Sequence, residues 1–165
     1  PDPAAIVSRA DGKVVAVEDL DASPHYEGPC RRISIFLNVF NVHVNRTPFD
    51  GSVVDCQSKK GKFLNAAAVE ASEQKEAMNV RMDTPIGPMT VRQIAGLVAR
   101  RIVCLAGPGD ALRRGQRFGM IKFGSRTELY LPCDCAIAVK VNDHVKGAAT
   151  IVAYAPADKP TETQS

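Results

Sequence analysis

One serine of this chain stands where its hydroxyl could act as a nucleophile. In "FGSRTELYLP", Gly124 and Ser125 lie between an apolar run and a strand-like segment. Such a pair is usually an ordinary tight turn, because both residue types suit turn positions. A nucleophilic serine needs a base to take its proton, and histidine is the usual choice.

The chain has three histidines, and His43 is the best candidate for that base. It ends an apolar strand in "FNVHVNRTP", whereas His25 and His144 lie in polar, loop-like segments. A histidine there is also commonly a core or edge residue of a strand. Asp11, in "RADGKVV", is in the first instance the first residue of an Asp-Gly turn.

Length and composition are those of one globular domain. A chain of 165 residues buries about 70% of its unfolded surface when it folds. The net charge is +3, which is below the strongly basic balance of a dedicated nucleic-acid binder. Basic residues occur in local pairs with almost no aromatic residues between them, so we expect no nucleic-acid partner. A mildly basic surface still suits an anionic membrane.

The cysteines indicate neither a disulfide framework nor a metal centre. Their number, five, is odd, and reduced thiols in a cytoplasmic protein are the simplest interpretation. Cys133 and Cys135 could form half of a zinc site, but no second cysteine pair or spaced histidine pair completes it. No run approaches the roughly 20 apolar residues that span a bilayer.

The elements that position these residues are mostly short strands, at 12–20, 31–44 and 50–58. One alanine- and glutamate-rich helix is expected at 63–78. Residues 108–124 and 141–155 echo each other, which resembles the half-repeats of lipoyl- or biotin-carrier β-sandwiches. The fold prediction is therefore α+β but mostly β: a compact domain with barrel-sandwich-like half-repeats in its C-terminal third. We expect residues 156–165 to be a disordered tail.

Several long segments together resemble one enzyme family. They are "SRADGKVVAVE", "ISIFLNVFNVHVNRTPFDGSV", "GKFLNA", "QIAGLVARRIVC" and "GDALRRGQRFGMIKFGSRTELYLP". In order and nearly end to end, over about 1–155, they are similar to the short prokaryotic (archaeal-type) phosphatidylserine decarboxylases. The resemblance implies a proenzyme with a single catalytic domain, 1–165, that cuts itself at Gly124–Ser125. The products would be a beta chain, 1–124, and an alpha chain, 125–165.

The resemblance also implies the chemistry. Ser125 would attack the carbonyl of Gly124 and end as a pyruvoyl group, which is the covalent cofactor. His43 would take the serine proton, and Asp11 would orient and charge-balance the imidazole. The pyruvoyl ketone would form a Schiff base with the serine headgroup of phosphatidylserine and draw in electrons as carbon dioxide leaves. His43 would then protonate the product carbon, phosphatidylethanolamine would leave, and no metal or diffusible cofactor is expected.

One departure from the family pattern concerns the histidines. Longer family members carry two histidines in the segment that matches "NVHVNR", whereas this chain has His43 alone, with Arg46 where the second would fall. Asn41 stands where many relatives have aspartate. His43 must therefore serve both self-cleavage and decarboxylation, or leave one step to another group. Arg46 could contact the lipid phosphate, or it could be a surface arginine at a strand end.

The remaining expectations concern partners and place. The substrate would be phosphatidylserine in an anionic membrane, the two cleaved chains would stay associated, and a homodimer is possible. The enzyme would work at the cytoplasmic face of the inner membrane, peripherally or through an anchoring segment absent from this chain. Two alternatives stay open: a pyruvoyl decarboxylase of a soluble amino acid or another aminolipid, and a non-enzymatic β-sandwich binding module.

Overall fold

The computed structural model describes residues 2–8, 10–37, 42–59, 76–95, 102–104, 107–122 and 125–156. Within these ranges all of the regular secondary structure is β-strand, as the mostly-β prediction requires. Most of the predicted helix at 63–78 lies outside the described residues, as does the predicted tail beyond Pro156.

The end of the helix prediction is wrong. Residues 76–78 open a strand, β6, in which Met78, Val80 and Met82 alternate toward the core. Their burial against neighbouring strands outweighs the helix propensity of the local sequence.

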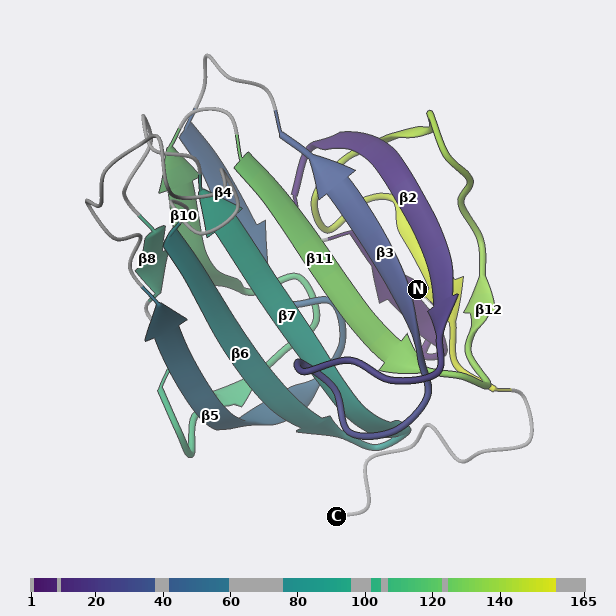
Figure 1. Ribbon diagram of the computed structural model, residues 1–165, viewed down its shortest axis with the longest axis horizontal. Coiled ribbons are helices and arrows are strands. Elements are labelled where there is room, and N and C mark those ends of the chain that lie inside the picture. Colours follow the sequence, from purple (N-terminus) through teal and green to yellow (C-terminus); the bar gives the residue numbers. More distant parts are fainter. Residues whose placement is uncertain are drawn as a thin grey trace, which may run out of the picture.

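Eight strands form one antiparallel sheet in the order β13-β2-β3-β11-β7-β6-β5-β9 (Figure 1). Strands β11 and β7 are its central pair. The strands are β2 (Gly12–Leu20), β3 (Cys30–Phe36), β5 (Gly51–Lys59), β6 (Glu76–Thr84), β7 (Gly87–Ala95), β9 (Ala111–Leu112), β11 (Ser125–Pro132) and β13 (His144–Val145).

Two three-stranded sheets complete the fold, and β4, β10 and β14 are drawn behind the larger sheet in Figure 1. One sheet has the order β1-β14-β12, and the other has the order β4-β10-β8. Their strands are β1 (Ala5–Val7), β14 (Ile151–Tyr154), β12 (Ala136–Ile137), β4 (Val42–Arg46), β10 (Arg117–Lys122) and β8 (Ile102–Cys104).

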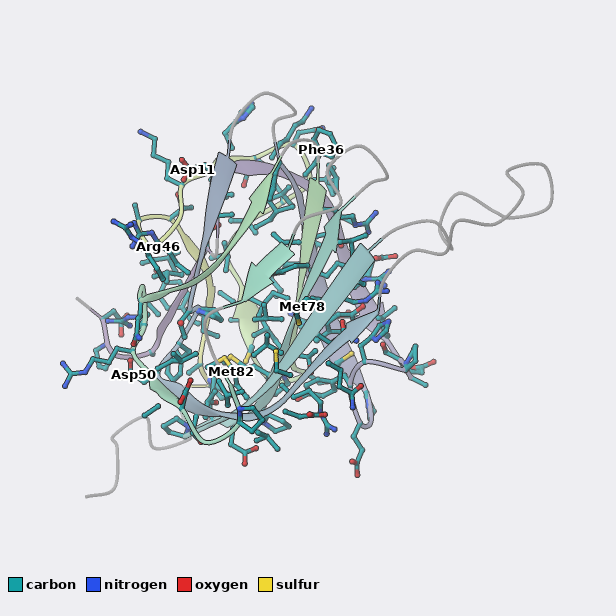
Figure 2. The ribbon with its side chains drawn as sticks, turned by 90° about the vertical axis from the view of Figure 1, so that its left-hand side faces the viewer. Asp11, Phe36, Arg46, Asp50, Met78 and Met82 are labelled. Carbon is teal, nitrogen blue, oxygen red and sulfur yellow. The ribbon has the colours of Figure 1, made fainter. Side chains whose placement is uncertain are left out.

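The core lies on the face of the eight-stranded sheet that we call the inner face. Along β11, Leu129 and Leu131 are buried in this core, whereas Glu128 and Tyr130 alternate to the opposite, outer face. Figure 2 shows the larger sheet and the β4-β10-β8 sheet on either side of the interior. Apolar burial between these layers is the main stabilising contribution to such a fold.

The strands repeat in two halves around the central pair. The split half contains β1–β3 and β11–β14, and the inserted half contains β4–β10. From the centre outward, β11, β3, β2 and β13 match β7, β6, β5 and β9. The sheet β1-β14-β12 likewise matches β4-β10-β8. The half-repeats predicted from the C-terminal third therefore extend through the whole described chain.

Local details repeat with the strands. The register shift of β2 against β3, between Val14 and Ala16, matches that of β5 against β6, between Val53 and Asp55. Positive φ angles also recur in pairs, at Asn142 (82°) with Gly109 (91°) and at Ala148 (63°) with Gly115 (84°).

Candidate active site

Ser125 is the first residue of β11, a strand in the middle of the eight-stranded sheet. It pairs with Ala95 of β7. The next residue, Arg126, pairs with Phe36 of β3 on one side and with Ile94 of β7 on the other. Residue 125 is therefore held by ladder pairing at one end of a central strand. Gly124 lies outside the described residues.

The predicted site residues come from segments that meet at this end of the fold, which we call the Ser125 end. In Figure 1, β11, β2 and β4 start at the upper end of the molecule, where β3 and β10 finish. Figure 2 shows Asp11 and Phe36 there. Phe36 pairs with both Arg126 and Lys13, so the start of β2 lies two strands, roughly 10 Å, from the start of β11.

His43 reaches the same end through the smaller sheet. Its backbone lies in β4, opposite Ile121 of β10. Strand β10 ends at Lys122, just before Ser125 begins β11. The backbone thus brings the segments that carry Ser125, His43 and Asp11 to one end of the molecule. The proton transfer between their side chains stays a prediction.

Asp11 makes a structural contact that is repeated at the matching position of the other half. Its Oδ1 accepts a hydrogen bond from the backbone N–H of Gly147 at 2.7 Å. In the inserted half, Asp50 Oδ1 accepts one from the backbone N–H of Arg114 at 2.6 Å. The sequence signal was the repeat of "DGKVV" as "DGSVV", which our sequence analysis missed. Asp11 therefore caps a turn, and its part in catalysis stays a prediction.

Arg46 lies at the opposite end of β4 from the Ser125 end. It pairs with Arg117, the first residue of β10. Its guanidinium Nη1 donates to the carbonyl oxygen of Gly115 at 3.0 Å. The structure thus gives Arg46 a role in supporting a loop, and its contact with a lipid phosphate stays a prediction.

The inner face beside Ser125 carries a polar residue that sequence reasoning missed. Gln93 is 0% exposed, and neither atom of its side-chain amide has a hydrogen-bond partner within the described part of the chain. It pairs with Thr127 of β11, which is also buried. The sequence signal for it was that Gln93 stands at the next inward-facing position of the strand after the apolar residues Met89 and Val91.

The outer face behind Ser125 carries a buried carboxylate with several partners. Glu128 accepts a hydrogen bond from the Tyr130 hydroxyl at 2.8 Å. Glu128 also forms ion pairs with Arg92, at 3.4 Å, and with Arg126, at 3.2 Å. Arg126 in turn donates to the Ser34 hydroxyl at 3.0 Å. These contacts join β3, β7 and β11, so they fix the strand that begins with Ser125.

The same surroundings shift the acidity of Tyr130. Burial raises the pKa of its phenol, and the negative charge of Glu128 raises it further, while Arg32 opposes the shift. Tyr130 therefore stays protonated and continues to donate to Glu128 well into the alkaline range.

A polar pocket of about 250 Å³ also opens on the outer face, over β5, β6 and β7. Its lining residues include Ser23, His25, Gln57, Asn79 and Arg81. Asp11 and Arg46, the predicted site residues whose side chains the structure describes, do not line it.

The described ranges contain no group of three or more His, Cys, Asp or Glu side chains placed to hold a metal ion. They also contain no helix long and apolar enough to cross a membrane.

Comparisons with known proteins agree with the sequence resemblance. A family model described as phosphatidylserine decarboxylase matches residues 1–153. A phosphatidylserine decarboxylase proenzyme of Magnetococcus marinus is 46% identical over 147 residues, which are 88% of this chain and 67% of the relative. That of Desulfotalea psychrophila is 45% identical over 152 residues, 92% of this chain and 71% of the relative. That of Syntrophus aciditrophicus is 48% identical over 143 residues, 86% of this chain and 67% of the relative. No solved structure matches the chain.

Proposed function

The chain belongs to the phosphatidylserine decarboxylase family, and from this premise we propose that it converts phosphatidylserine to phosphatidylethanolamine after cutting itself at Gly124–Ser125. The observation that carries the proposal is the position of Ser125. It begins a central strand at the end where the segments bearing His43 and Asp11 meet. The relatives are named proenzymes, which supports a processing step.

Self-cleavage begins at the Ser125 hydroxyl. His43 takes the proton from Oγ, and Oγ forms a bond to the carbonyl carbon of Gly124, whose oxygen takes the displaced electron pair. When this oxyanion collapses, the C–N bond breaks and the Ser125 nitrogen gains a proton, which leaves an ester. β-Elimination then releases residues 1–124 with a free carboxylate. Residue 125 becomes dehydroalanine, and water converts it to pyruvoyl with loss of ammonia.

The sheet topology supports a two-chain product that stays folded. Chain 125–165 would contribute β11, β12, β13 and β14, and chain 1–124 the other strands. Strand β11 pairs with β3 and β7, β13 pairs with β2, and β14 pairs with β1. Every one of these pairings joins the two products, so the cut leaves the ladders and the core intact.

The residues present fit a pyruvoyl group at position 125. Backbone pairing to Ala95 holds that position at the end of a central strand, and Gln93 and Thr127 make the adjacent inner face polar. The group, once formed, supplies an electrophilic ketone that draws in the electrons released as carbon dioxide leaves. His43 would hold the proton that the product carbon receives.

The substrate is then an aminolipid in an anionic membrane, at the cytoplasmic face of the inner membrane. The net charge of +3 favours such a surface, and the printed names of the relatives favour phosphatidylserine. A homodimer would be compatible with this placement.

The test compares the wild-type chain with Ser125→Ala. On a denaturing gel, wild type should give two bands, whereas Ser125→Ala should give one full-length band. Wild type should release carbon dioxide from phosphatidylserine in vesicles, and Ser125→Ala should release none. Uncleaved wild-type protein, or activity in Ser125→Ala, would overturn the proposal. Activity on free serine but not on vesicles would replace the lipid substrate with a soluble amino acid.

A further inference from the structure

Gln93 is a buried polar residue that has no hydrogen-bond partner in the described part of the chain. Its side chain is 0% exposed, and its Nε2 and Oε1 atoms make no hydrogen bond within the described ranges. Nearly all buried side-chain amides in folded proteins are hydrogen-bonded, because an unpartnered one lowers stability. Such a group therefore needs an explanation other than the stability of the fold.

The strand register places Gln93 beside Ser125. Ser125 pairs with Ala95, and Gln93 is the next residue of β7 on the same face. Residues diagonal to each other across an antiparallel pair have Cα atoms about 7–8 Å apart, within reach of a long side chain. The register thus brings the Gln93 amide within side-chain range of the backbone of residue 125, at which the proposed cleavage takes place.

The other half of the molecule shows that the fold itself does not require a polar residue here. The repeat is centred on the Val91–Leu129 pair of β7 and β11. Gln93 stands two residues beyond Val91, and Leu131 stands two residues beyond Leu129. Leu131 is fully buried in the apolar core. The polar group therefore belongs to the end that carries Ser125 and is absent from its counterpart.

We propose that Gln93 is a catalytic residue of self-cleavage, whose Nε2–H donates a hydrogen bond to the oxyanion. This inference rests on the proposed function. As Ser125 Oγ bonds to the preceding carbonyl carbon, the carbonyl π electrons move onto oxygen, which needs a donor until the C–N bond breaks. A donor that is buried and unpartnered beforehand gives up no competing hydrogen bond, which makes it effective at this step.

The experiment measures self-cleavage of freshly synthesised full-length chain over time on a denaturing gel, for wild type and Gln93→Leu. Loss of one oxyanion donor slows such reactions about 10²–10³-fold, and we expect that decrease. Leucine is the residue that the matching position already accommodates. Because the substitution removes an unpartnered polar group from the core, Tm should rise by about 2–4 °C.

Two further variants sharpen the test. Thr90→Val removes a buried hydroxyl from the outer face of the same strand and should cleave at the wild-type rate. Gln93→Met keeps the length of the side chain but has no N–H donor, so it should cleave at least as slowly as Gln93→Leu.

Three outcomes would overturn the inference. They are cleavage of Gln93→Leu within about twofold of wild type, wild-type cleavage by Gln93→Met, and a lowered Tm in Gln93→Leu, which would mark a structural role. Wild-type chain that never cleaves would instead overturn the proposed function, so the two failures are distinguishable.

Discussion

The two halves of the molecule differ in how the two strands nearest the centre of the sheet are connected, which are β6 and β7 in the inserted half and β3 and β11 in the split half. In the inserted half, β6 and β7 are joined by a tight turn, in which the Thr84 hydroxyl donates to the carbonyl oxygen of Gly87 at 2.5 Å. In the split half, the matching strands β3 and β11 have no such turn. Strand β3 leads into the inserted half, and β11 begins at Ser125. The proposed cut therefore falls just before β11, at the position that corresponds to the β6–β7 turn of the inserted half. The sheet pairing does not depend on the peptide bond that is cut.

Residues at matching positions separate structure from chemistry. Asp11 and Asp50 make the same turn contact, which any repeat of this fold would need. Gln93 and Leu131 occupy matching positions in the core but differ in polarity. Features shared by the halves thus explain the fold, and features confined to the Ser125 end are the candidates for function.

The largest effect after Ser125→Ala is expected from His43→Ala. Removal of a positioned proton-transfer group typically slows a reaction about 10²–10⁴-fold, and we expect that decrease in decarboxylation per cleaved chain. The assay counts cleaved chains on a gel and measures carbon dioxide released from vesicles. His144→Ala, an exposed residue of β13, is the control. Full activity per cleaved chain in His43→Ala would show that another group donates the proton.

The pair Asp11→Asn and Asp50→Asn tests whether Asp11 does more than cap a turn. Asparagine keeps the oxygen that accepts from Gly147 or Arg114 and removes only the charge. If Asp11 charge-balances the His43 imidazole, Asp11→Asn should slow self-cleavage by about 10²-fold or more. Asp50→Asn should leave the rate unchanged. Equal rates for the two variants would reduce Asp11 to its structural role.

A smaller effect is expected from Glu128→Gln, which removes a buried carboxylate that has no counterpart in the inserted half. Thr90 occupies the matching position in β7. The substitution leaves Arg92 and Arg126 without a buried carboxylate, so the free energy of unfolding should fall by about 1–3 kcal/mol. Both arginines are partly exposed, which keeps the loss at the lower end of that range. Urea denaturation measures it, and an unchanged midpoint would contradict the role assigned to the network.

The smallest effect is expected from Tyr130→Phe, at about 1 kcal/mol for one hydrogen bond to Glu128. Burial raises the pKa of Tyr130 in the folded state, so the unfolded state loses its proton first as pH rises. The contribution of Tyr130 to stability is complete below pH 10, the ordinary tyrosine pKa, and declines above it. Between about pH 8 and pH 11, a range that brackets the ordinary tyrosine pKa, the urea midpoint should fall less steeply with pH in Tyr130→Phe than in wild type. Parallel curves would contradict this assignment.

Much of this architecture could be predicted from the sequence. The β-branched runs at 12–20 and 50–58 became β2 and β5, because alternation and Asp-Gly turns are local signals. The long apolar run at 31–44 became two strands, β3 and β4, in different sheets. The helix prediction failed at 76–78 because cross-strand burial, which is non-local, decides strands.

The site was less predictable than the strands. Ser125, His43 and Asp11 were found through the family resemblance, since nothing local distinguishes them from turn and strand residues. Gln93 escaped notice because its lack of partners is a property of the packed core. The correspondence between Asp11 and Asp50 is present in the sequence as a repeated Asp-Gly-X-Val-Val. Only the sheet order shows that these two segments occupy matching positions in the two halves.

Intact mass spectrometry of the purified, active protein tests the central claim most directly. The account predicts two polypeptides, residues 1–124 and residues 125–165, with a pyruvoyl group in place of the serine at the start of the second. A single 17.7 kDa chain with an unmodified Ser125 and full decarboxylase activity would contradict it.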